Sequence, residues 1–367
     1  CVVEQAGFGA ITIGNLEKYL TELAWEKGWV KNIEVNSSSK KKVAIIGSGP
    51  AGMAASSYLI QNGYQVDVFE KNDRVGGLMI YGIPNFKLDK SIVERRTDWL
   101  TNSGVKFHVN KEIGKDLTFQ ELEKNYDAIL VATGVYKARK LDIETSNINN
   151  SLPALDFLIE SNKVGLGDTP SSNKYLSAKD KHVVVIGGGD TAMDCVRTAI
   201  RQKAKEVTCL YRRNKENMPG SAREVLNAEQ EGVKFNWLSV PSKIISEKSE
   251  ASSLSYKVAT LGEADETGRR KPVDTGLEKQ IRSDLIIQAL GFEPEDLNSH
   301  FNSDLELTSW NTVKVDFKKF QTSNPKVFAA GDIVRGASLV VWAIHDGREV
   351  AKSIHQFLQS NQIKKAS

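Results

Sequence analysis

One unit occurs twice along this chain and limits the folds that are open to it. Each copy consists of a short apolar run, a glycine-rich turn, a helical stretch and a second apolar run, and the copies begin at residues 43–46 and 183–186. Apolar runs this short are typical of buried strands. Strands that alternate with helical stretches form parallel sheets covered by helices. The repeat therefore predicts an α/β protein with two domains of similar architecture.

Composition agrees with two ordinary globular domains. The chain has 367 residues, of which 40% are hydrophobic and 26% charged, and its net charge is +3. At roughly 150 residues per domain, this length fits about two domains. The small charge, without a stripe of lysines and arginines, argues against nucleic acid as a partner. The most apolar stretch, residues 43–60, is broken by glycines and a proline, so we expect no membrane-spanning helix.

The cysteines indicate a reducing compartment. Cys1, Cys195 and Cys209 form neither a disulfide framework nor a CxxC pair, so we expect a cytoplasmic protein. Cys195 should lie on a helix and Cys209 within a strand, both as small buried side chains. Because the chain begins with Cys1 rather than Met and shows no signal segment, we expect that a preceding segment was removed or is not included in this sequence.

The first glycine turn has the spacing of a dinucleotide-binding site. Gly47 permits a tight bend, Gly49 allows the backbone to approach a pyrophosphate, and Gly52 allows close helix packing. The amino end of the helix supplies N–H donors and a positive dipole. Glu70 ends the next apolar run. A carboxylate about 20 residues after the glycine turn can accept hydrogen bonds from ribose hydroxyls. The alternative is a structural turn beside a solvated glutamate.

The second turn differs in the residues that follow its second strand. Its glycines are Gly187 and Gly189, Ala192 takes the third small position, and the next apolar run ends in Arg212 and Arg213 without an acid. Guanidinium groups bind phosphate through hydrogen bonds worth roughly 1.5–3 kcal/mol each. The pair therefore predicts NADPH here, preferred over NADH by about 100-fold or more, and FAD in the first site. A surface arginine pair without a ligand is the alternative.

Shorter signals indicate that one domain is inserted in the other. Apolar runs end in Ala-Thr-Gly at 132–134 and Ala-Leu-Gly at 289–291, where the chain should leave each nucleotide-binding domain. Near the carboxyl end, Gly331 and Asp332 follow a further run, and a helix beginning near Ser338 would point its N–H groups at a ligand. Asp332 then binds a ribityl or ribose hydroxyl, or alternatively caps that helix.

The predicted fold class is α/β, with two Rossmann-like dinucleotide-binding domains, the NADPH domain inserted in the FAD domain. Residues 40–150 and 293–367 form the discontinuous FAD-binding domain, 151–292 the NADPH-binding domain, and 1–36 a helical N-terminal segment. Residues 251–282 are polar and typical of an exposed hairpin. The N-terminal segment has an apolar helix face that should pack on something, formed by Leu16, Tyr19, Leu20, Leu23 and Ala24.

The order of these signals resembles that of flavoprotein reductases with two dinucleotide-binding domains. Three strings narrow the resemblance: Gly-Gly-Leu-Met-Ile-Tyr-Gly-Ile-Pro-Asn-Phe-Lys-Leu at 76–88, the string at 211–224 with Asn-Met-Pro-Gly-Ser, and the string at 338–348 with Val-Val-Trp-Ala-Ile. With them the chain resembles the small (β) subunits of NADPH-dependent glutamate synthase over essentially its whole length. Reductase modules of dihydropyrimidine dehydrogenase and of NADH-dependent ferredoxin:NADP oxidoreductase share the layout but usually not these strings.

The resemblance implies cofactor contacts at the positions that match the family's motifs. For FAD they are Gly47, Gly49, Ala51, Gly52, Glu70, Lys71, Gly77, Leu78, Thr133, Gly134, Gly331 and Asp332. For NADPH they are Gly187, Gly189, Asp190, Thr191, Ala192, Arg212 and Arg213.

The resemblance also implies a route for electrons. A hydride passes from NADPH to FAD without a protein acid or base, so we expect no catalytic side chain. In the family, electrons continue through 4Fe–4S clusters to a large (α) subunit, where 2-oxoglutarate and glutamine yield glutamate. Each cluster needs four thiolates, and only Cys1 of that segment is present, so clusters are expected only in a full-length protein. Disulfide reductases of this fold are excluded because no CxxC or CxxxxC occurs.

Other functions stay open at this point. A reductase of the same layout could serve another acceptor, such as a ferredoxin or a pyrimidine-reducing domain. A partner-binding scaffold could keep both nucleotide folds without turnover. The five histidines lack metal-ligand spacing, so no metal site is expected. The sequence does not specify the electron acceptor, the oligomeric state or the role of residues 251–282.

Overall fold

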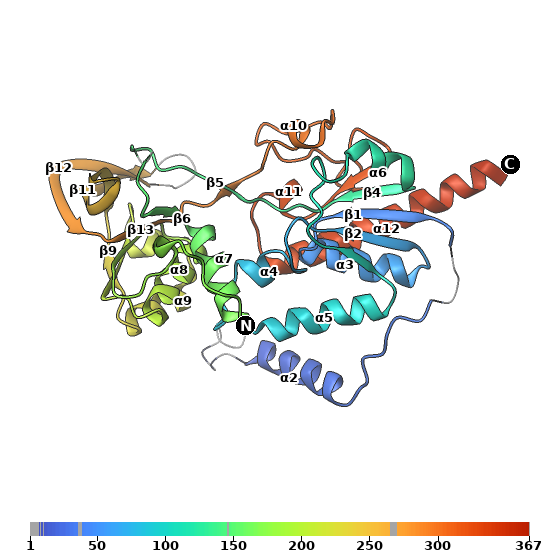
Figure 1. Ribbon diagram of the computed structural model, residues 1–367, viewed down its shortest axis with the longest axis horizontal. Coiled ribbons are helices and arrows are strands. Elements are labelled where there is room, and N and C mark those ends of the chain that lie inside the picture. Colours follow the sequence, from blue (N-terminus) through green and yellow to red (C-terminus); the bar gives the residue numbers. More distant parts are fainter. Residues whose placement is uncertain are drawn as a thin grey trace.

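In the computed structural model the chain forms two α/β units side by side (Figure 1). The structure describes residues 7, 9, 11–35, 39–144, 147–264 and 270–366, with side chains up to residue 360. Cys1 lies outside this part of the chain. The predicted strands at 43–46 and 183–186 are confirmed, and each is the central strand of the parallel sheet of one unit.

The first unit is a parallel five-stranded sheet in the order β15-β4-β1-β2-β3. Its central strand is buried because four successive apolar residues follow Lys42. Its strands are β1 (Lys42–Ile46), β2 (Gln65–Phe69), β3 (Lys106–His108), β4 (Ala128–Val131) and β15 (Val327–Ala329). One face packs on α3 (Pro50–Gln61), α5 (Lys90–Asn102) and α12 (Val340–Ala366). The other packs on α6 (Phe119–Asn125), α10 (Leu297–Phe301) and α11 (Asp332–Arg335).

The second unit repeats this plan with the strand order β6-β13-β7-β8-β9. Its strands are β6 (Ser151–Pro153), β7 (His182–Ile186), β8 (Glu206–Leu210), β9 (Lys234–Asn236) and β13 (Leu285–Gln288). One face packs on α7 (Ala154–Gly165), α8 (Asp190–Arg201) and α9 (Ala222–Gln230). Two short 3-10 helices, η1 (Lys174–Leu176) and η2 (Lys215–Asn217), lie in its connections.

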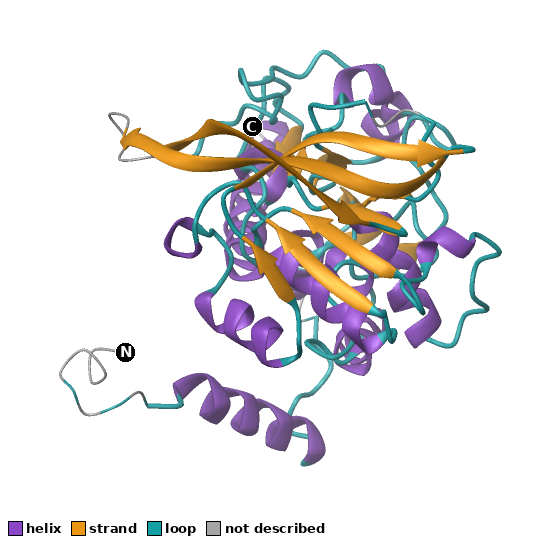
Figure 2. Ribbon diagram, turned by 90° about the vertical axis from the view of Figure 1, so that its left-hand side faces the viewer, coloured by secondary structure: helices purple, strands orange, loops and turns teal. Residues whose placement is uncertain are grey.

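The predicted exposed hairpin at 251–282 is only half right. An antiparallel pair is present, β11 (Glu250–Ala264) with β12 (Arg270–Arg282), but a third strand, β10 (Ser239–Glu247), joins it. Leu254 of β11 is completely buried and packs with Val184 and Ile286 of the parallel sheet. The antiparallel sheet therefore covers the face that the helices leave open, as Figure 2 shows for its long strands.

Two short strands mark where the chain crosses between the units. β5 (Lys137–Ala138) and β14 (Phe292–Glu293) pair in antiparallel fashion. The crossing out of the first unit and the crossing back are therefore hydrogen-bonded to each other. Each follows directly from a strand end that the sequence marked with Ala-x-Gly.

The N-terminal helix is confirmed, but its apolar face is packed only in part, since Leu23 and Ala24 are half-buried and the rest of the face is exposed. Helix α2 (Ile13–Glu26) is present, and Gly28 follows its end. Leu16, Tyr19 and Leu20 are 55%, 63% and 62% exposed, and no residue of α2 is buried. The helix meets Arg95 of the first unit through an ion pair of 2.8 Å with Glu22 and through the Trp25 ring, whose centre lies 4.6 Å from the guanidinium carbon.

Candidate cofactor sites

The first site begins at the turn between β1 and α3, where the backbone leaves no room for side chains. Gly47 has φ +102°, and a Cβ there would lie 2.4 Å from the carbonyl oxygen of Ala132 at the end of β4. A Cβ on Gly52 would lie 2.2 Å from the Gly47 carbonyl oxygen, so α3 packs directly on the turn. The space beside Gly49 is open. The turn and the amino end of α3 line a cavity, where N–H donors can meet an anion.

This first cavity collects most of the residues expected to bind FAD. It is lined by Gly47, Gly49, Ala51, Glu70, Lys71, Leu78, Thr133, Gly134 and Asp332. Gly52, Gly77 and Gly331 are not among its lining residues. Instead they permit close packing behind it: a Cβ on Gly77 would lie 2.9 Å from the Gly49 Cα, and one on Gly331 would lie 3.0 Å from the Ala51 Cβ.

The hydroxyl of Thr133 shows that this cavity suits a polar ligand. Its Oγ1 is buried and has no hydrogen-bond partner among the described residues. A buried hydroxyl without a partner costs about 1–3 kcal/mol. The threonine lines the cavity beside the crowded Gly47 turn. A ligand with hydrogen-bonding groups would complete this site.

Glu70 lies just after β2, next to the turn, and is 5% exposed. Its Oε2 accepts hydrogen bonds from the Ser48 backbone and hydroxyl at 3.2 and 2.6 Å. Its Oε1 accepts from the Asn72 backbone and side-chain amide at 2.9 and 2.8 Å. The carboxylate therefore organises the loops on both sides while it lines the cavity. The sequence did not identify Ser48 and Asn72, because neither belongs to the glycine pattern.

Tyr136 is a further lining residue that the sequence did not identify. The ammonium of Lys71 lies 5.2 Å from the centre of its ring and 3.5 Å from the Glu295 carboxylate. Burial, with a smaller contribution from Glu70, raises the pKa of the Tyr136 hydroxyl. Tyr136 is therefore a protonated donor at neutral pH. Its place two residues after Gly134 is the one signal that could have suggested it.

Asp332 and the amino end of α12 close the other side of the first cavity. Asp332 Oδ1 accepts a hydrogen bond of 2.9 Å from the Ser338 hydroxyl, and burial raises the pKa of its carboxyl. The helix predicted near Ser338 begins at Val340, and residues 338–340 line the cavity. The positive end of the α12 dipole is thus placed beside the cavity, where it can stabilise negative charge.

The second turn, between β7 and α8, repeats the crowding of the first. Gly187 has φ +141°, and a Cβ there would lie 2.2 Å from the carbonyl oxygen of Ala289, just after β13. A Cβ on Gly188 would lie 2.4 Å from the Tyr211 ring. The tyrosine therefore packs under the turn and holds it against the sheet.

Part of the string at 211–224 folds back onto this turn. The Gly220 N–H donates to the Gly188 carbonyl at 2.9 Å, and the Ser221 N–H donates to Asp190 Oδ1 at 2.9 Å. Asp190 is the first residue of α8, so its carboxylate joins the start of α8 to the start of α9. This string is therefore part of the walls around the second turn.

The second cavity has a basic lining. Arg139 and Lys140 from the crossing segment join Arg212 and Arg213, while Asp142 is the one carboxylate among the described lining residues. The sequence did not identify Arg139 and Lys140, since they lie about 70 residues before the arginine pair and meet it only through the crossing. Of the residues expected to bind NADPH, this cavity is lined by Gly187, Gly189, Thr191, Arg212 and Arg213.

The remaining expected NADPH residues lie elsewhere. Ala192 is completely buried in the core of the second unit, and Asp190 holds the Ser221 N–H. The two arginines also differ: Arg213 Nε donates to the Tyr211 hydroxyl at 3.1 Å, whereas Arg212 is exposed. Arg212 is therefore the freer of the two to meet a phosphate.

The described cysteines are unsuited to redox chemistry. Cys195 on α8 and Cys209 on β8 are buried free thiols, as predicted. Burial raises the pKa of both, that of Cys209 to about 12, so neither forms a thiolate at neutral pH.

Within the described ranges, no cluster of His, Cys, Asp and Glu could hold a metal ion. No helix in the described part is long and apolar enough to cross a membrane.

Comparisons with known proteins agree with this architecture. The chain matches the pyridine nucleotide-disulphide oxidoreductase family over residues 41–347. It is 51% identical to the glutamate synthase (NADPH) small chain of Azospirillum brasilense, across 98% of this chain and 75% of that protein. It is 38% identical to the NADP(+)-dependent formate dehydrogenase subunit beta of Moorella thermoacetica, across 88% of this chain and 44% of that protein.

A solved structure has the same fold. FprA from Mycobacterium tuberculosis, in complex with NADPH, superposes with a TM-score of 0.74 at 18% identity, over 89% of this chain and 86% of that one. The family match and the paired glycine turns define an oxidoreductase that uses a pyridine nucleotide. The chain belongs to the pyridine nucleotide-disulphide oxidoreductase family and, within it, to the glutamate synthase small chains. Both memberships support FAD and NADPH as its cofactors.

Proposed function

We propose that this chain passes a hydride from NADPH to FAD, with FAD in the first cavity and NADPH in the second. The observation that carries the proposal is the pairing of two crowded glycine turns with linings of different charge. Glu70 and Asp332 supply carboxylates in the first cavity, while Arg212 and Arg213 supply guanidinium groups in the second. We also propose the domain division that follows: residues 40–150 and 293–367 for FAD, and 151–292 for NADPH.

In the first cavity the chain's own groups would hold FAD by its polar parts. The turn at Gly47 and Gly49 would receive the pyrophosphate, with the amino end of α3 behind it. Glu70 would accept ribose hydroxyls, and the unpartnered Thr133 hydroxyl would find its partner. FAD held there would supply the redox chemistry, in which the hydride of NADPH and one proton from solvent would give FADH2 and NADP+.

In the second cavity the basic side chains would recognise the 2′-phosphate of NADPH. Arg212 has no protein partner among the described residues and is free to bind it, with Arg213 beside it. Planar guanidinium groups match phosphate oxygens in geometry as well as charge. Tyr211 takes the place that Glu70 has in the first unit, so no carboxylate directly after β8 opposes a phosphate.

The route beyond the flavin is proposed from the relatives. The glutamate synthase relative is named as a small chain, so we propose a large glutamate synthase subunit as partner and electron acceptor. There 2-oxoglutarate and glutamine would yield glutamate, in the cytoplasm. A second candidate is an acceptor outside glutamate synthase. The relative named as a formate dehydrogenase subunit favours it, because a similar chain forms part of a different enzyme there. In both cases the hydride step is the same.

An absorption spectrum of the purified chain tests the hydride step. We expect flavin absorbance that bleaches on anaerobic addition of NADPH, and much more slowly with NADH at equal concentration. Full bleaching by dithionite serves as the control for reducible flavin. Flavin that dithionite bleaches and NADPH does not would refute the proposal, and absence of flavin after supplied FAD would favour a scaffold.

A further inference from the structure

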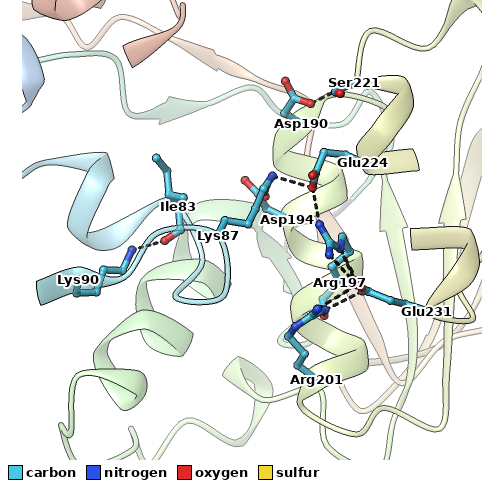
Figure 3. Close-up of polar contacts among 10 residues, drawn as sticks. All are labelled: Ile83, Lys87, Lys90, Asp190, Asp194, Arg197, Arg201, Ser221, Glu224 and Glu231. Atoms are coloured by element: carbon cyan, nitrogen blue, oxygen red, sulfur yellow. Dashed lines mark hydrogen bonds and ion pairs between the residues drawn. The ribbon is translucent and has the colours of Figure 1, made fainter. Parts of the chain in front are cut away.

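A chain of ion pairs runs from the first unit into the helices of the second, outside both cavities (Figure 3). It starts in residues 82–89, between α4 (Leu78–Tyr81) and α5, here called the bridging segment. Lys87 Nζ lies 2.7 Å from the Asp194 carboxylate on α8 and 2.9 Å from that of Glu224 on α9. Two of the strings that carry the family resemblance therefore meet at Lys87 and Glu224.

The ion pairs continue along one face of α8. Glu224 is shared with Arg197, 2.7 Å away, and both Arg197 and Arg201 bind Glu231, at 2.6 and 2.7 Å. Asp194, Arg197 and Arg201 share this face because they are three and four residues apart.

The bridging segment also places an aromatic ring on this face. The Phe86 ring centre lies 4.9 Å from the guanidinium carbon of Arg197 and 3.8 Å from that of Arg201. A guanidinium within about 6 Å of a ring centre is attracted to it. Lys87 and Phe86 together therefore cover the same face of α8.

The other end of the bridging segment is fixed to the wall of the first cavity. Lys90 is 5% exposed, and its ammonium donates to the Met79 carbonyl at 2.9 Å and to the Ile83 carbonyl. Met79 lines the first cavity, and α8 begins at the second glycine turn. The segment thus connects the wall of one cavity to the helix that starts at the other.

The contact is partly desolvated and geometrically specific. The side chains of Lys87, Asp194 and Glu224 are 24%, 13% and 17% exposed. Partly buried ion pairs contribute little net stability, because the cost of removing the charges from water offsets their attraction. One role of such pairs is to fix a specific geometry. The first unit also meets α7, where Asn162 donates to the Tyr81 carbonyl at 2.8 Å, and the loop after α7, where Arg74 donates to Asp168 at 2.9 Å. Lys87, by contrast, forms ion pairs with α8 and α9, the two helices that begin beside the second glycine turn.

We propose that Lys87 is a positioning residue that fixes the second unit in the orientation from which hydride transfer takes place. The inference rests on the proposed function. Hydride transfer needs reacting atoms about 3–3.5 Å apart, and a misplacement of about 1 Å can cost 100-fold in rate. Lys87 lies in neither cavity lining. Its loss should therefore slow transfer while both cofactors still bind.

The test is anaerobic stopped-flow reduction of the flavin in wild type, Lys87→Met and Lys87→Arg. For K87M we expect the rate constant at saturating NADPH to fall about 10- to 100-fold, with flavin content and the NADPH dissociation constant within twofold of wild type. K87R keeps the charge and should stay within about threefold. Lys215→Met is the matched control: it removes an ion pair of 2.6 Å to Glu229 of α9 that stays inside the second unit, and it should not change the rate.

The outcomes separate this inference from the proposed function. Wild type that NADPH does not reduce would refute the proposed function itself. Wild type that is reduced, with K87M within twofold of it, would overturn the role of Lys87. A weaker NADPH affinity in K87M that fully explains its lower activity would also overturn it, since that is a binding role. If K87M does not fold, Asp194→Asn decides: an unchanged rate constant overturns the proposal and a lower one at unchanged affinity supports it.

Discussion

The two glycine turns share a backbone arrangement and differ in the side chain that follows the second strand. Gly47 faces the Ala132 carbonyl, and Gly187 faces that of Ala289, so neither position accepts a Cβ. In the first unit the residue after β2 is Glu70, which bonds to the loops around the turn. After β8 it is a tyrosine that packs under the turn. The two turns therefore share their backbone, and the proposed difference between their nucleotides rests on a few side chains.

The helices after the two turns differ in what covers them. A Cβ on Gly347 of α12 would lie 2.3 Å from the Ala51 carbonyl oxygen and 3.0 Å from the Ala54 Cβ, so α12 packs tightly on α3. The fifth residue of α3 is Ala54, and the fifth of α8 is Asp194. Asp194 meets Lys87 of the other unit. The fifth position of α3 is therefore covered by a helix of its own unit, whereas the fifth position of α8 contacts the other unit.

The largest effects should come from the glycines that the two turns share. In Gly47→Ala and Gly187→Ala the new Cβ meets a backbone carbonyl at 2.4 and 2.2 Å, and a positive φ adds about 1–2 kcal/mol of strain. We expect Gly47→Ala to lose bound flavin. Gly187→Ala should keep flavin that dithionite bleaches but be reduced by NADPH about 100-fold more slowly. Flavin absorbance and stopped-flow reduction measure both effects.

An alanine at an open glycine position controls for general damage. A Cβ on Gly14 of α2 would have no atom within 4 Å, and the φ of this residue is ordinary, so Gly14→Ala should match wild type in both assays. If Gly187→Ala released flavin as Gly47→Ala does, the two turns would not serve separate cofactors.

A smaller effect should come from the arginines that distinguish the second site. Arg212→Ala with Arg213→Ala removes two charge-assisted bonds, so KM for NADPH should rise about 100-fold while KM for NADH changes little. Arg212→Ala alone should give the larger share, because Arg213 also bonds to Tyr211. Steady-state rates with a dye acceptor measure this, with Lys234→Ala on β9 as an exposed control. An equal rise of KM for NADPH and NADH would show that the two arginines do not recognise the 2′-phosphate.

Local patterns were enough to predict the turns and their strands. Gly47, Glu70 and Gly187 lie within short units whose spacing reflects contacts between neighbours in the chain. Apolar runs likewise predicted β1, β4, β7 and β13. The apolar stripe of α2 predicted a helix correctly, but its packing requires a covering surface that the stripe itself does not specify.

Contacts between distant segments could not be predicted. Lys140 lines the same cavity as Arg212, and the two come together where β5 and β14 pair as the chain crosses between the units. Lys87 appeared within a family-like string, yet its partners Asp194 and Glu224 lie more than 100 residues away. The side of β11 that covers the sheet was missed because its alternating polar residues resemble those of an exposed hairpin.

The smallest effect is expected at Asp194, the position where α8 differs from Ala54 of α3. Burial raises the pKa of Asp194 to about 6, against the opposing hydrogen bond of Lys87, whereas an unfolded aspartate has a pKa of about 3.9. A carboxyl whose pKa rises on folding stabilises the fold most below pH 4 and loses that contribution as the pH rises through 6. Asp194→Asn should therefore raise Tm by roughly 2–4 °C at pH 7.5 and leave it unchanged near pH 4.

As the pH falls through 6, the rate of flavin reduction should decrease while the stability of the fold increases. In wild type, protonation of Asp194 below pH 6 weakens its contact with Lys87, so reduction by NADPH should slow as the pH falls through 6. The other charges that face Asp194 are Glu224, Asp190 and Lys90. In the Asp194→Asn variant the rate should be several-fold lower than in wild type at pH 7.5 and nearly independent of pH between 5 and 7. A lower Tm of the variant at pH 7.5, together with an unchanged rate, would show that the contrast between α3 and α8 is one of packing alone. Loss of a purely structural ion pair lowers stability but does not change the pH profile of hydride transfer.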